Sequence, residues 1–135
     1  MKLNFAIICD NAFTDEVGRL NIIQTFDVIF APNFPAIHPR LSIVTNYALE
    51  EKDKKDEEYK QTLTIINSSA KEPIISLENV VTPKVGKERN IQYITNIVGL
   101  SFPVESVYEV SARVNGKDFG KVVAINVDRS TAKSN

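Results

Sequence analysis

The dipeptide Asn115-Gly116 separates two runs rich in β-forming residues, and it constrains the fold more than any other feature of the chain. Asn and Gly both tolerate the positive φ that the two central positions of a tight hairpin turn require. Residues 108–114, before the turn, alternate apolar and polar side chains, so one face of the hairpin is apolar. The rest of the chain must therefore supply strands that cover this face.

Other apolar runs bounded by turn-forming residues predict further strands, and no run shows the helical period of apolar residues. Residues 31–39 contain three prolines and predict a connection that crosses from one sheet to another. We therefore expect an all-β fold, a two-sheet antiparallel sandwich of about eight strands with Greek-key or immunoglobulin/C2-like topology. The predicted strands are 3–9, 20–30, 40–49, 59–67, 74–81, 90–102, 108–114 and 117–127.

The length of 135 residues suits a single domain, which we expect over residues 1–127, followed by a flexible polar tail over 128–135. The formal net charge is −1, from 16 basic and 17 acidic residues, so no global charge attracts nucleic acid or an anionic membrane. No run approaches the ~20 apolar residues of a membrane helix. The single cysteine, Cys9, excludes an intramolecular disulfide, and the apolar run 3–9 is too short for a secretion signal. We expect a cytoplasmic protein.

The only histidine, His38, is the residue that any Ser-His-Asp or Cys-His arrangement would have to use. It lies in the proline-rich segment, where nothing nearby in the sequence indicates a nucleophile, so we interpret it as a structural loop residue. Cys9 falls on the inward parity of the first strand, which predicts an inert buried thiol. The chain is therefore expected to be no enzyme, with no catalytic residue and no cofactor; a hydrolase or isomerase that uses His38 is the third hypothesis.

Three carboxylates, Asp10, Asp15 and Glu16, lie in one connection and are the candidate metal ligands. Calcium-binding sandwiches collect such oxygens from at least two neighbouring loops. The second set would have to come from residue 118 or from the charged run 50–58, in which lysines are mixed with the acids. We therefore expect these acids to cap turns rather than to bind a metal.

Two loop features complete the search for sites. Lys84, Lys87 and Arg89 form a small basic loop without the spacing of a phosphate loop and without interleaved aromatic residues, so it is interpreted as solvated. Phe13 and Phe34 are apolar residues in predicted connections, and they are the candidate contacts for a protein partner.

The segment 5–11 (Phe-Ala-Ile-Ile-Cys-Asp-Asn) and the pattern Glu-x-Gly-Arg-Leu-x-Ile-Ile over 16–23 resemble the start of a family of small bacterial proteins that is catalogued as a domain of unknown function. Later features of that family have counterparts in Phe34-Pro35, Tyr108 and Asn115-Gly116. This chain departs from the family pattern, because Asn11 replaces an acid, Arg19 replaces a lysine, and Ser106-Val107 replaces a Pro-Gly pair. The resemblance implies a β-sandwich and no enzymatic activity.

These observations favour a non-catalytic binding or assembly module that acts through its loops or sheet edges. Its expected partner is an unidentified protein or further copies of the chain. The alternative is a calcium- or lipid-binding C2-like sandwich that uses Asp10, Asp15 and Glu16.

Overall fold

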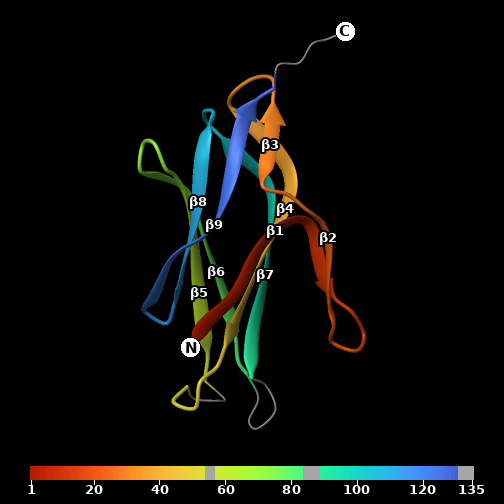
Figure 1. Ribbon diagram of the computed structural model, residues 1–135, viewed down its shortest axis with the longest axis vertical. Coiled ribbons are helices and arrows are strands. Elements are labelled where there is room, and N and C mark those ends of the chain that lie inside the picture. Colours follow the sequence, from red (N-terminus) through yellow and green to blue (C-terminus); the bar gives the residue numbers. More distant parts are fainter. Residues whose placement is uncertain (54–56, 84–88, 131–135) are drawn as a thin grey trace.

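The computed structural model describes residues 1–53, 57–83 and 89–130 (Figure 1). Over these residues the chain forms strands and turns, which confirms the predicted all-β class. No helix that could cross a membrane occurs in this part of the chain. The strands are β1 (Lys2–Thr14), β2 (Leu20–Thr25), β3 (Val28–Ala31), β4 (Ala36–Ala48), β5 (Tyr59–Asn67), β6 (Glu72–Val81), β7 (Asn90–Phe102), β8 (Ser106–Val114) and β9 (Lys117–Arg129).

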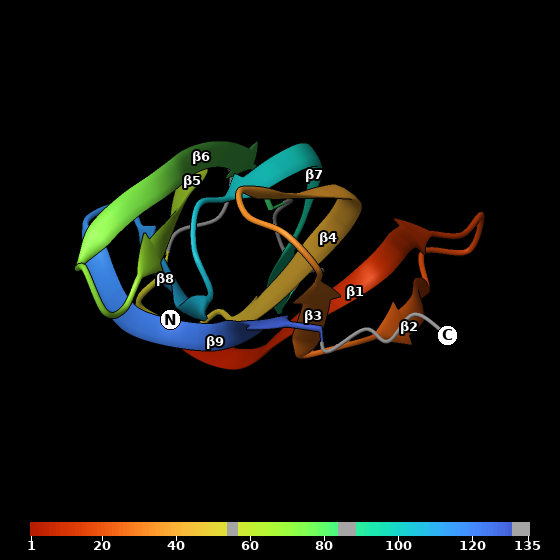
Figure 2. The ribbon, with the colours of Figure 1, turned by 90° about the horizontal axis from the view of Figure 1, so that it is seen from above.

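The strands form two sheets, one in the order β2-β1-β4-β7 and one in the order β3-β9-β8-β5-β6. Seen from above, the sheets face one another, with β6 beside β7 at one margin and β1 beside β9 at the other (Figure 2). This sandwich-like arrangement follows the prediction of two sheets. It departs from a wholly antiparallel arrangement in one pair, because β3 runs parallel to β9.

The hairpin around Asn115-Gly116 forms as predicted. Val114 pairs with Lys117, and the two turn residues have φ angles of 46° and 85°. The apolar face of β8 is buried, with Tyr108 and Val110 at zero exposure. β9 continues to Arg129, beyond residue 127, where we placed the end of the domain.

The predicted strand 20–30 is two strands, and this is why the sheets contain nine strands rather than eight. β2 belongs to the four-stranded sheet, whereas β3 belongs to the five-stranded sheet. The apolar residues on both parities of this run are explained by a change of sheet at Phe26 and Asp27, after which the opposite parity faces the core.

β4 begins at Ala36, so the crossing predicted over 31–39 is confined to residues 32–35. Pro39, which has no amide hydrogen, lies opposite Gly99, whose φ is 67°. At this point in both β4 and β7, the residues that face the core change from one parity to the other. Val98 and Leu100 have the same parity along β7, but Val98 is 80% exposed, whereas Leu100 is 5% exposed.

The core between the sheets has an aliphatic part and a tyrosine-rich part. In the second part, the Tyr47 hydroxyl and Thr45 Oγ1 each donate a hydrogen bond of 2.6 Å to Gln61 Oε1, while Tyr93 donates to the Tyr59 carbonyl at 2.7 Å. Burial raises the pKa of Tyr47 to about 12. The aliphatic part also includes two aromatic residues. It contains Ile8, Ile29, Leu41, Ile43, Leu63, Ile65, Ile97, Leu100, Phe102, Tyr108, Val110, Ala112, Ile125 and Val127.

A third apolar cluster lies around Cys9, Ala12 and Val44, and partly buried side chains of β2 and β7 pack against it. Beyond this cluster, the end of the β1–β2 hairpin extends past the region where the two sheets face one another (Figure 2). The buried position predicted for Cys9 is confirmed, and burial raises the pKa of its thiol.

Candidate functional site: a slot between β3 and β4

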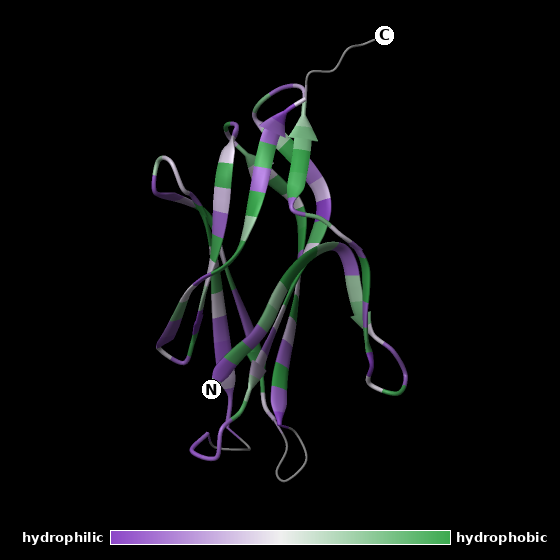
Figure 3. Cartoon of the chain, viewed as in Figure 1, coloured by the Kyte–Doolittle hydropathy of each residue, from purple (hydrophilic) through white to green (hydrophobic). Residues whose placement is uncertain are grey.

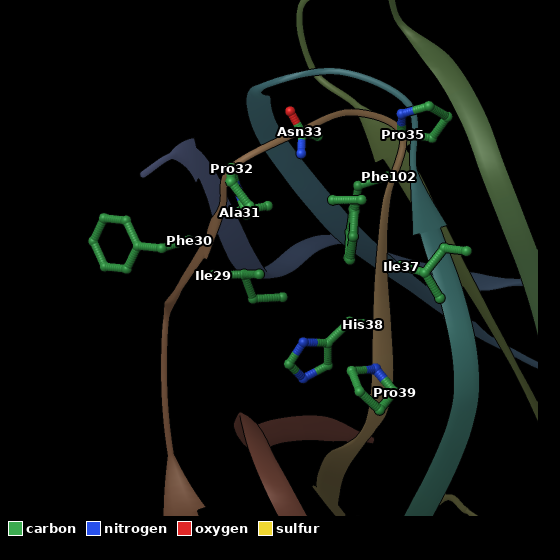
Figure 4. Close-up of a pocket in the computed structure, with 11 residues that line it drawn as sticks. Ile29, Phe30, Ala31, Pro32, Asn33, Pro35, Ile37, His38, Pro39 and Phe102 are labelled. Carbon is green, nitrogen blue, oxygen red and sulfur yellow. The ribbon is translucent and has the colours of Figure 1, made fainter. Parts of the chain in front are cut away.

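A cavity of about 320 Å³ opens between β3 and the first part of β4. A second cavity of about 510 Å³ lies beside it, lined by β3, by the end of β2 and the bend after it, by Asp10 of β1 and by His38 of β4. They share Ile29, Phe30 and His38 in their lining, so we treat them as one feature, the β3–β4 slot. Figure 4 shows the smaller of the two. The slot is lined by Asp10 and Phe102 and by residues 24–26, 28–33 and 35–39.

Apolar and polar groups share the lining of the slot. The side chains of Ile29, Ala31, His38 and Phe102 lie between the two strands, whereas the Phe30 side chain points away from the opening (Figure 4). β3 is hydrophobic along its whole length (Figure 3). A group that enters the slot therefore meets apolar side chains together with a similar amount of polar surface.

The outer edge of β3 has no strand partner among the described residues. β3 pairs only with β9, and the carbonyls of Asp27 and Ala31 accept hydrogen bonds from the backbone of that side, at 2.8 and 2.9 Å. Because successive residues of a strand direct their backbone groups to opposite edges, the N–H and C=O groups of Val28 and Phe30 point away from β9. These groups lie on the slot side of β3.

The facing edge of β4 is also unpaired over its first part. β7 pairs with β4 from Ala36 to Ala48, but β1 pairs with it only from Ser42 onward. Within the described chain, the edge of residues 36–41 that faces away from β7 has no ladder. The slot is therefore bordered on both sides by backbone edges of the kind that accept an additional strand.

The polar side chains in the slot are few and have few partners. The His38 ring lies 5.6 Å from that of Phe26, centroid to centroid, and no residue in the described part of the chain forms a hydrogen bond with it. Asp10 is half-buried, and its carboxylate has no hydrogen bond or ion pair with a described residue. His38 and Asp10 are thus two groups that a ligand could engage. Other polar residues that line the slot are Gln24, Thr25 and Asn33.

The connection above the slot is held by Arg129. Its guanidinium lies over the Phe34 ring, 5.1 Å from the centroid, and donates to the Pro32 carbonyl at 2.9 Å. Ser130 N–H donates to the carbonyl of Ala31. The upper boundary of the slot is therefore fixed to the end of β9.

The structure separates the three candidate metal ligands. Asp10 lies in the slot, while Asp15 belongs to the β1–β2 turn, where Oδ1 accepts from the Val17 and Arg19 amides at 3.0 and 2.9 Å. The hydrogen bond from the Arg19 backbone is the main cause of the lowered pKa of Asp15. The described residues contain no group of three His, Cys, Asp or Glu side chains that could hold a metal, and Glu16 is exposed.

The remaining sequence candidates lie in different surroundings. His38 lies in the slot, with no nucleophile bonded to it in the described chain. Phe13 is 44% exposed on β1 rather than in a loop, and Phe34 is half-buried beneath Arg129. Three other predictions fall on positions outside the described residues. These positions are Lys84 and Lys87 of the basic loop, residues 54–56 of the charged run, and the tail residues 131–135.

Sequence reasoning did not find the slot, since its walls are backbone edges. The sequence places Phe30 at the end of the predicted strand 20–30 and Ile37 in the predicted connection 31–39. The signal that could have revealed β3 is the change of apolar parity around Phe26, which indicates that one strand ends and another begins.

With this geometry in place, comparison with protein families identifies the chain: it belongs to a family of unknown function, DUF6941, which matches residues 4–127. The resemblance drawn from the sequence, to an uncharacterised domain family, is therefore confirmed. No curated protein matches the chain in sequence.

Proposed function

We propose that this protein is a non-catalytic binding module that receives an extended segment of a partner protein in the β3–β4 slot. The observation that carries the proposal is the pair of unpaired backbone edges, β3 on one side and residues 36–41 of β4 on the other. In strand addition, main-chain hydrogen bonds supply affinity, and pockets for alternate side chains supply specificity. The slot offers both.

The side chains of the slot favour binding over catalysis. Its floor is made by Ile29, Ala31 and Phe102, which suit the apolar side chains of a bound strand. Catalysis by His38 requires a nucleophile or an orienting acid within hydrogen-bonding reach, and the described residues place neither there. A neutral imidazole can instead donate to or accept from the backbone of a bound segment.

The experiment is selection of binders from a random octapeptide library, followed by affinity measurements on two variants of one residue. Phe30→Pro removes a slot-facing N–H, whereas Phe30→Thr removes the same side chain and keeps that N–H. Proline is tolerated on a free strand edge, so both variants should fold. Loss of one main-chain hydrogen bond corresponds to up to about tenfold in affinity, and we expect Phe30→Pro to bind more weakly than Phe30→Thr by this factor.

Amide hydrogen exchange provides a second readout that does not depend on a variant. Bound peptide should protect the amides of Val28 and Phe30, which point into the slot, more than those of exposed residues on β6. Equal binding by the two Phe30 variants, together with unchanged exchange at Val28 and Phe30, would overturn the proposal.

A second candidate, a lipid or other small apolar molecule, is favoured by the cavity volumes of about 320 and 510 Å³, which fall within the range of small-molecule sites. Such a ligand would contact Ile29 and Phe102 without hydrogen bonds to β3. It would shift the methyl resonances of the floor and leave exchange at the Val28 and Phe30 amides unchanged, so the same measurement separates the two candidates.

A further inference from the structure

The lower end of the slot carries a carboxylate without a partner. Asp10 lines the larger cavity and is half-buried. Within the described chain its side chain takes part in no ion pair or hydrogen bond. The nearby guanidinium of Arg40 donates to Asn11 Oδ1 at 2.8 Å and forms no ion pair with Asp10.

The upper end of the slot carries charges of both signs. Arg129 lies there over Phe34, with its guanidinium bonded to the Pro32 carbonyl. The Arg129 amide donates to the Glu105 carboxylate at 2.8 Å. A cation at the lower end would instead face Asp10, which has no partner among the described residues, so the lower end is where a ligand cation gains most.

We propose that the segment bound in the slot carries a lysine or arginine at one end, seated against Asp10, and apolar side chains at alternate positions along the floor. This inference rests on the proposed strand addition and specifies its partner. A half-buried carboxylate has lost part of its hydration without gaining a partner, so a ligand cation restores favourable interactions there. The alternation follows because every second residue of an added strand faces the same side as Ile29 and Ala31.

The dimensions of the two walls set the length of the segment. β3 has 4 residues, and β4 presents residues 36–41 before its pairing with β1 begins at Ser42. An added strand of about four to six residues would match both walls. A segment of this length has room for two or three inward side chains and one terminal cation.

The test uses the octapeptides selected on the wild-type protein, acetylated and amidated so that their charges come from side chains alone. Asp10→Asn keeps the shape of the side chain and removes its charge. Glu51→Gln, an exposed acid in the loop after β4, is the matched control. The affinity of each peptide and of its version with the basic residue replaced by alanine is measured on the three proteins at low salt.

We expect the selected peptides to be enriched in Lys or Arg at one end, to lose about tenfold in affinity on Asp10→Asn, and to be unaffected by Glu51→Gln. The alanine versions should bind wild type and Asp10→Asn equally. Peptides that depend on the Phe30 amide but show neither basic enrichment nor sensitivity to Asp10→Asn would overturn this inference and leave strand addition standing. Equal binding by Phe30→Pro and Phe30→Thr, together with unchanged exchange at the Val28 and Phe30 amides, would overturn both.

Discussion

The two halves of β4 differ in their neighbours, and the difference determines how much of each half is buried. From Ser42 onward β4 lies between β1 and β7, and residues 42–45 have no exposed surface. From Ala36 to Leu41 the same strand has β7 on one side and the slot on the other, and Ile37 is 68% exposed. One strand thus serves as an interior strand of a sheet in its second half and as a sheet edge in its first half.

The largest expected loss of stability comes from the same substitution, Ile→Ala, made in each half of β4. Ile43→Ala removes a side chain with no exposed surface and should lower the free energy of unfolding by about 2–5 kcal/mol. Ile37→Ala removes an exposed side chain and should change it by less than about 0.5 kcal/mol. Urea denaturation of both variants measures the difference, and equal losses would contradict the division of β4.

The next largest loss of stability is expected at Gly99 of β7, which lies opposite Pro39 in the first half of β4. Gly99 has a φ of 67°, and a Cβ at this position would meet no atom within 4 Å, so the cost of a substitution comes from the backbone alone. Gly99→Ala should destabilise the protein by about 1–2 kcal/mol. Gly99→Asn, which tolerates this conformation better, should cost less in the same thermal denaturation experiment. If both variants cost the same, the backbone conformation is not the cause.

A smaller effect is expected in the tyrosine-rich part of the core. Tyr47→Phe removes the hydrogen bond to Gln61 Oε1, which still accepts from Thr45, and should cost about 0.5–1.5 kcal/mol at neutral pH.

The same variant has a distinct pH dependence. Burial raises the pKa of Tyr47 from about 10 to about 12, so the protonated form is favoured in the folded state. Its contribution is fully present below pH 10 and is lost as the pH rises toward 12. Unfolding free energies measured from pH 8 to 12 should therefore fall less steeply for Tyr47→Phe than for wild type; parallel curves would argue against a buried phenol.

The smallest expected loss of stability is at Arg129, next to the slot. Arg129→Gln removes the contact with the Phe34 ring, and because the site is exposed the loss of stability should be about 0.5–1 kcal/mol. Its consequence should be local: faster amide exchange in residues 28–31 with unchanged exchange in β5. A uniform increase in exchange across both sheets would instead identify Arg129 as part of the general stability of the fold.

Local patterns predicted the parts of this fold that local chemistry decides. Asn115-Gly116 specified the closing hairpin because its two φ angles are properties of the turn residues themselves, and the alternation in β8 named its buried face. The pairing of β3 with β9 and the opening beside His38 could not be predicted in this way. They depend on which distant strands become neighbours, and the parity change in the run 20–30 indicates where a new strand begins but not which strand it pairs with.

The parallel pairing of β3 with β9 joins residues from opposite ends of the chain, Val28 with Asn126 and Ala31 with Arg129. During synthesis, β3 is made early and remains without its ladder until β9 leaves the ribosome. One wall of the slot is therefore completed only when β9 is in place, and a chain interrupted before β9 would lack this wall.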